Sequence, residues 1–117
     1  MSISPNPQTI TLGPGVLSNT ANVTLTNTAA AGGPSVTITA VAVTGAGASF
    51  SPPQAWIFTK GTDGCTGTTL APGASCTVQA RFTNLRGGAT ANHAGAITFT
   101  DNATGSPQSG VLTGVSQ

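Results

Sequence analysis

Short runs of alternating apolar and polar residues recur along the whole chain. In an extended strand, such alternation places apolar side chains on one face and polar side chains on the other. Gly, Pro, Asn and Asp separate the runs about every 8 to 12 residues, and no run has the 3.6-residue period of a helix. The pattern predicts one all-β domain over residues 1–117, a β-sandwich of about seven to eight strands. The strands are expected near residues 8–12, 21–27, 36–44, 54–60, 76–82, 96–100 and 111–115.

Three segments depart from simple alternation. In 36–44, Val36 and Ile38 share one face while Val41 and Val43 lie on the other. The switch near Ala40 predicts a β-bulge, or a strand that bends from one sheet into the other. Residues 84–95 are polar and glycine-rich and are expected to form a loop. Phe50 follows a turn and is expected to enter the core.

The composition excludes several classes of protein. Only 4% of the residues are charged, against about 25% in ordinary soluble proteins. The basic residues Lys60, Arg81 and Arg86 form no run, which argues against a nucleic-acid partner. No stretch approaches the roughly 18 apolar residues that cross a bilayer, so membrane insertion is not expected. The first ten residues lack the basic and apolar regions of an intact signal peptide.

The chain has two cysteines, Cys65 and Cys76, separated by ten residues that include a Pro-Gly turn. An even count in a chain whose composition is typical of exported or exposed proteins favours a disulfide between them. The alternative is a pair of free, buried thiols in a cytosolic protein.

The stretch that contains the second cysteine carries a family resemblance. "LAPGASC" before "TVQARF", with ten residues between the cysteines, resembles the bacterial ASPM-SPD2-Hydin-like modules, also called choice-of-anchor D repeats. The chain lacks that family's usual Phe-x-Pro after the cysteine strand and its final Gly-x-Gly. The resemblance implies an immunoglobulin-like sandwich and a non-catalytic scaffold. The likeness extends to "SISPNPQTITLG" at 2–13, "VTLTNT" at 23–28, "DNATGSPQ" at 101–108 and "VLTG" at 111–114.

Residues able to carry out catalysis are scarce. The chain has one histidine, His93, and two acids, Asp63 and Asp101, both in turn-like segments. An acid–base or nucleophilic site needs several such groups held together, and the chain has no nucleophile-elbow motif. We expect the aspartates to bond nearby backbone N–H groups in turns. Neither an enzyme, a cofactor nor a metal site is predicted, since structural zinc takes four Cys or His ligands and calcium needs several oxygen ligands.

The segment around the single tryptophan is the best candidate for a partner contact. In a strand, Trp56 and Phe58 share one face and Ile57 lies on the other. One set then lies outside the core and can anchor a partner, unless a loop covers it and both sets are buried.

These features predict a non-enzymatic structural module docked on a larger assembly. An uncharged exterior is easily dehydrated, and unprotected edge strands favour association. The leading version is a virion (phage capsid) decoration or cement protein that contacts capsid subunits or copies of itself at the virion surface. One alternative is an extracellular adhesive or spacer module of a secreted bacterial cell-surface protein. Another is a carbohydrate-binding accessory domain, which would need exposed aromatic side chains.

Overall fold

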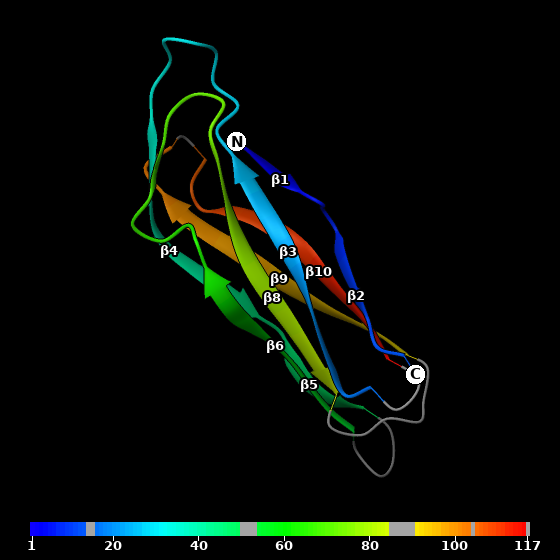
Figure 1. Ribbon diagram of the computed structural model, residues 1–117. Helices are drawn as coiled ribbons and strands as arrows, with labels where there is room; N and C mark the ends of the chain where they lie inside the picture. Colours follow the sequence, from blue (N-terminus) through cyan, green and yellow to red (C-terminus); the bar gives the residue numbers. More distant parts are fainter. Residues whose placement is uncertain (14–15, 50–53, 85–90, 104, 117) are drawn as a thin grey trace.

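The computed structural model describes residues 1–13, 16–49, 54–84, 91–103 and 105–116, which form ten strands in two sheets packed face to face (Figure 1). One sheet, called sheet A, has the strand order β1-β3-β8-β6-β5, and the other, sheet B, has the order β2-β10-β9-β4-β7. Paired strands are antiparallel except β2 and β10, which are parallel. The strands are β1 (Ser2–Ser4), β2 (Gln8–Thr11), β3 (Ser18–Thr26), β4 (Val36–Thr44), β5 (Ala46–Ser49), β6 (Gln54–Asp63), β7 (Thr69–Leu70), β8 (Ser75–Asn84), β9 (Ala91–Asp101) and β10 (Gln108–Ser116).

The strand order is that of an immunoglobulin-like sandwich, so the predicted fold class is confirmed. The seven strands of that fold correspond, in chain order, to β1, β3, β4, β6, β8, β9 and β10. The first, second, fourth and fifth of them (β1, β3, β6 and β8) lie in sheet A. The third, sixth and seventh lie in sheet B, as the fold requires. The strands β1, β5 and β7 were not predicted, because each has two to four residues and at most one large apolar side chain, whereas 8–12 has two in alternation.

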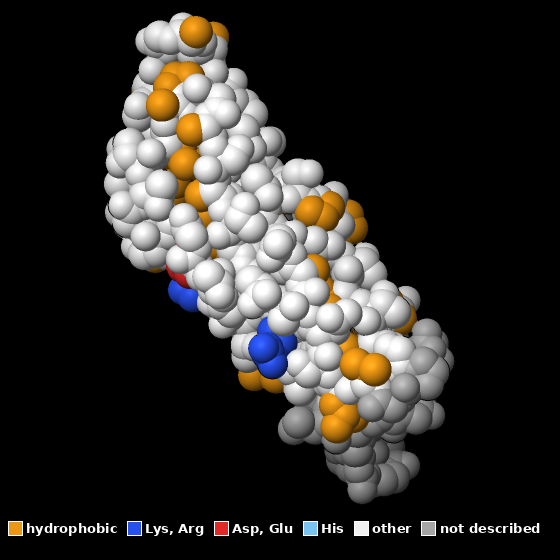
Figure 2. All heavy atoms as spheres, viewed as in Figure 1, with side chains coloured by type: hydrophobic (Ala, Val, Ile, Leu, Met, Phe, Trp, Pro, Cys, Tyr) orange, Lys and Arg blue, Asp and Glu red, His pale blue; other side chains and the backbone are white. Residues whose placement is uncertain are grey.

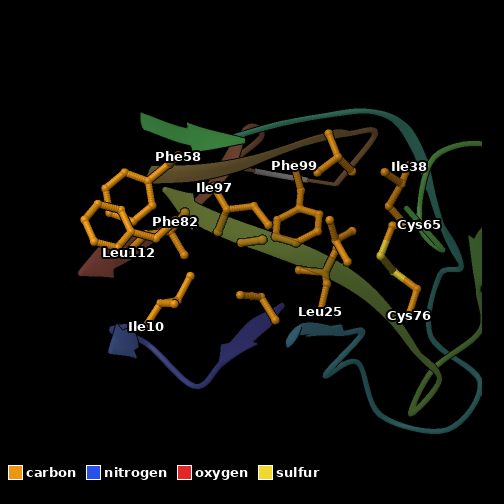
Figure 3. Packing of buried hydrophobic residues seen from close by; sticks show 14 of the residues in the cluster. Ile10, Leu25, Ile38, Phe58, Cys65, Cys76, Phe82, Ile97, Phe99 and Leu112 are labelled. Carbon is orange, nitrogen blue, oxygen red and sulfur yellow. A yellow bond between two sulfur atoms is a disulfide. The ribbon is translucent and has the colours of Figure 1, made fainter. Parts of the chain in front are cut away.

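The core lies between the sheets and consists of the side chains that alternation predicts to face inward. On β8, Cys76, Val78, Ala80 and Phe82 are buried, while the residues between them face outward. Figure 3 shows Phe58, Phe82 and Leu112 at one end of the core, Ile97 and Phe99 in the middle, and the two cysteines at the other end. The predicted core residue Phe50 lies outside the described residues.

Strand β4 contains the predicted bulge. Its pairing with β9 shifts register between Ile38 and Ala40, which carries the apolar side chains of both halves of β4 into the core. The passage from sheet B to sheet A occurs later, at Gly45, whose φ of +128° is open to glycine and strained for other residues. The chain then continues as β5 beside β6 in sheet A.

The predicted loop at 84–95 is wrong in its second half, because Ala91–Asp101 forms strand β9. In this strand His93 and Gly95 face inward and Ala94 faces outward. Gly95 packs against the ring of Phe58, since a Cβ added there would lie 2.6 Å from Phe58 Cδ2. A glycine and a histidine therefore occupy core positions that alternation reserves for apolar residues, so the strand was predicted only at 96–100 and its first part was missed.

Candidate interaction surface

The three candidate contact residues on β6 lie in different environments. Phe58 is buried in the core at 2% exposure, and Trp56 is half-buried and packs against the core. Ile57 faces outward from sheet A and is 42% exposed. The pattern was correct about the faces, and among the three only Ile57 has much of its side chain exposed to solvent.

The ring of Trp56 is held by other aromatic side chains. It stacks on His93, with ring centroids 4.7 Å apart and an interplanar angle of 25°, and meets Phe58 edge-on at 5.9 Å. Trp56 Nε1 and His93 Nε2 are buried and hydrogen-bond to no described residue. Burial lowers the pKa of His93, so the imidazole is neutral in the folded protein at neutral pH. The described aromatic residues thus pack inward, and none of them forms the exposed stacking platform that sugar binding uses.

The predicted disulfide is present at the other end of the core. Cys65 and Cys76 are bonded, with their Cα atoms 5.2 Å apart, and both are buried (Figure 3). The bond ties the turn that follows β6 to the beginning of β8. It closes the segment that contains β7 and the Pro-Gly turn.

Asp63 organises the turn before the disulfide, as predicted. Its Oδ1 accepts hydrogen bonds from the backbone N–H groups of Cys65 and Thr66, at 2.8 and 3.0 Å. Its Oδ2 accepts from the Thr66 hydroxyl and from Lys60 Nζ. Burial acts to raise the pKa of Asp63, but these hydrogen bonds together outweigh it and hold the pKa well below its usual range.

Replacing Asp63 by asparagine is expected to lower the free energy of unfolding by about 2 kcal/mol at neutral pH, because hydrogen bonds to a charged group are lost. The pKa of Asp63 is depressed by folding, so its contribution is complete above the unfolded-state pKa of about 4 and is lost as the pH falls below that value. Urea unfolding at several pH values checks this. The difference in the free energy of unfolding between wild type and Asp63→Asn should be constant above about pH 5 and should become smaller toward about pH 2. If the difference in the free energy of unfolding stayed the same down to about pH 2, the role assigned to Asp63 would be contradicted. His93 is present in both proteins, so its titration does not contribute to this difference.

The structure does not bring His93 together with the aspartates. His93 and Asp101 both lie on β9, eight residues apart, which corresponds to about 27 Å along an antiparallel strand. Asp101 Oδ1 accepts from the backbone N–H of Ala103, and Asp63 is bonded within its own turn. Among the described residues, no three His, Cys, Asp or Glu side chains group in a way that could hold a metal ion.

One hollow of about 510 Å³ lies between the loop that follows β3, the start of β4 and the turn after β9. Its described lining consists of Met1 and residues 27–29, 34–36 and 102–103, without an acidic, imidazole or thiol side chain. The N-terminal amine donates a hydrogen bond to Thr28 Oγ1 at 2.8 Å. The hollow therefore offers mainly small uncharged side chains, together with the N-terminal ammonium group.

The exterior of the sheets is almost free of charge. On the outward positions of the described strands, Arg81 of β8 is the only charged residue. Figure 2 shows blue and red confined to small areas on a surface that is otherwise white with scattered orange. Lys60 and Asp63, which form an ion pair with a 3.0 Å Nζ–Oδ2 distance, lie in the C-terminal part of β6.

No family model, curated protein or solved structure matches this chain. The resemblance to the choice-of-anchor D modules therefore stays a prediction, while the fold rests on the strand order itself. The part of the chain that the structure describes contains no helix long and apolar enough to cross a membrane.

Proposed function

We propose that this chain is a non-enzymatic structural module that docks through its sheet faces onto protein subunits of a larger assembly. A virion surface, where it would act as a decoration or cement protein, is the assembly that we favour. The observation that carries the proposal is the uncharged exterior: the outward side chains of both sheets are mainly Thr, Ser, Asn, Gln and Ala, with Arg81 the only charged one described.

Such a surface is suited to burial. Removing a charged side chain from water costs several kcal/mol unless a well-placed partner compensates, whereas hydroxyl groups and small apolar side chains are dehydrated at much lower cost. Charged residues are correspondingly depleted in the centres of protein–protein interfaces. A fold that exposed these faces only to water would have no physical reason to avoid charge, which aids solubility.

The shape of the molecule favours a second candidate, a spacer module in a chain of similar domains. The principal dimensions are 54 × 19 × 19 Å. Figure 1 places the start of β1 in the upper half of the long axis and the end of β10 toward the lower end. This geometry allows sandwiches to be joined end to end, as an adhesive or spacer protein of a bacterial surface would require.

A photo-crosslinking experiment in the natural source tests the proposal. A photoreactive residue is placed at outward position Thr98 of β9, at outward position Thr77 of β8, or at buried Val78 as a control. The expected result is that the chain sediments with a repetitive particle and that one outward position, but not Val78, crosslinks to a subunit of that particle. Recovery as a free protein without crosslinks would overturn the proposal. Sedimentation with the cell envelope would favour the spacer.

A further inference from the structure

The outer face of sheet B differs from the rest of the exterior. Ile97 and Phe99 of β9 and Leu112 of β10 point into the core, so the residues that alternate with them point outward. Val111, in the middle of this face, is 51% exposed. The described outward side chains of this face carry no charge and are nearly all small. They are Thr9, Thr11, Thr37, Ala40, Ala42, Thr44, Thr69, Asn92, Ala94, Ala96, Thr98, Thr100, Ser109, Val111, Thr113 and Val115.

The outer face of sheet A is more polar. Arg81 and Gln79 project from β8, and Asn22 lies opposite Gln79 on β3. Cross-strand hydroxyl pairs occur on both faces: Thr26 Oγ1 and Ser75 Oγ lie 2.8 Å apart on sheet A, and Thr37 Oγ1 and Thr69 Oγ1 lie 3.0 Å apart on sheet B. The side chains of sheet A thus include a cation and long amides that resist dehydration, whereas sheet B presents small side chains interleaved with hydroxyl groups. If one broad face becomes buried, sheet B is the face with the lower cost of dehydration.

The size of the face is comparable to that of a stable interface. Its longest strand, β9, has 11 residues and is about 37 Å long, and five strands are about 19 Å wide, so the sheet covers at most about 700 Å² in projection. A standard protein–protein interface buries about 800 Å² on each partner. Small side chains also allow two sheets to approach to about the 10 Å spacing of stacked sheets.

The chemistry of the face fits a second copy of the same chain. In a two-fold symmetric interface the same patch lies on both sides, so a charged patch would face its own charge. The face of sheet B has no charge to repel its copy. Its threonine and serine hydroxyls both donate and accept hydrogen bonds, so a hydroxyl from one copy can pair with a hydroxyl from the other in either direction. A strongly charged partner would find nothing on this face to complement its charge.

We propose that two copies of this chain pair face to face through the outer surface of sheet B. The inference rests on the proposed function, since it names the face and the partner through which an assembly would be built. Arg81 and the rest of sheet A remain outside the pair, available to solvent or to further subunits.

The test is sedimentation equilibrium of the purified, disulfide-bonded chain over a hundredfold range of concentration. The wild type is expected to reach twice the 11.3 kDa mass of one chain. Val111→Lys should weaken dimerisation by about tenfold or more, because it brings two like charges into the interface. The matched control Thr77→Lys adds the same charge to an exposed position of sheet A and should leave the dimer unchanged. Val111→Thr, which keeps a β-branched, uncharged residue, should also preserve it. Thermal unfolding of each variant checks that it is folded.

Three results would overturn the inference. The first is a wild type that stays monomeric, and the second is a dimer that Val111→Lys leaves intact. The third is loss of the dimer in Thr77→Lys as well, which would indicate that sheet A takes part in the interface. These results are separate from the crosslinking experiment. If the chain is a monomer in solution but crosslinks within a particle, the proposed function stands and this interface does not. If the chain is a dimer but is found free of any assembly, the interface stands and the proposed function does not.

Discussion

Replacing both Cys65 and Cys76 by alanine is expected to lower the free energy of unfolding by about 3 kcal/mol. The bond closes a segment of about a dozen residues, and opening a loop of this length restores about that much conformational free energy to the unfolded chain. Both side chains are buried in the core, so the packing of their sulfur atoms is lost as well. For a domain of this size, the corresponding fall in Tm is about 10 °C or more.

Thermal and urea unfolding with and without a reductant measures this effect. The wild type should lose stability when reduced, while the alanine double variant should show the same transition in both conditions. Alkylation of the unreduced wild type controls for the presence of the bond. A double variant as stable as the oxidised wild type would show that the bond constrains little that the sheets do not already hold.

Replacing Gly95 by alanine is expected to destabilise the fold by about 3 kcal/mol. The added Cβ would lie 2.6 Å from Phe58 Cδ2 and 2.6 Å from the backbone oxygen of Thr44, and real Cβ atoms do not approach other atoms so closely. The ring of Phe58 cannot easily move away, because it packs against Phe82 with ring centroids 4.8 Å apart. Neither can the backbone of Thr44, which is paired with β9 and precedes the crossing at Gly45.

The matched control is Gly13→Ala, where the one described atom within 4 Å of the added Cβ is Val16 Cγ2, at 3.9 Å. This variant should stay within about 0.5 kcal/mol of the wild type in urea unfolding. Adding Phe58→Leu to Gly95→Ala should recover part of the lost stability relative to the sum of the single variants, since one of the two clashes is removed. The packing described for β9 would be contradicted if the effects of Gly95→Ala and Phe58→Leu on the free energy of unfolding were strictly additive. It would also be contradicted if Gly95→Ala had wild-type stability.

The alternation of side chains was a reliable guide wherever a strand had its apolar residues in regular order. It placed every inward residue of 76–82 in the core and the irregularity of β4 at Ala40. It assigned Trp56 and Phe58 to one face of β6 and Ile57 to the other. It failed at residues 91–95, where His93 and Gly95 occupy inward positions because aromatic rings from β6 and β8 fill the space beside them. Those rings are distant in sequence, and no local pattern reports them.

The sequence by itself thus determined that the chain is all-β, which residues of most strands face the core, and that the exterior is nearly uncharged. Only the tertiary structure decided which strands share a sheet, and therefore that sheet B presents a continuous face of small, neutral side chains while Arg81 lies on the opposite sheet. The reason is physical: alternation is a property of one extended segment, whereas membership of a sheet depends on backbone hydrogen bonds between segments far apart in the chain. The strands β9 and β10 form one face with β2, whose residues precede them by about a hundred positions.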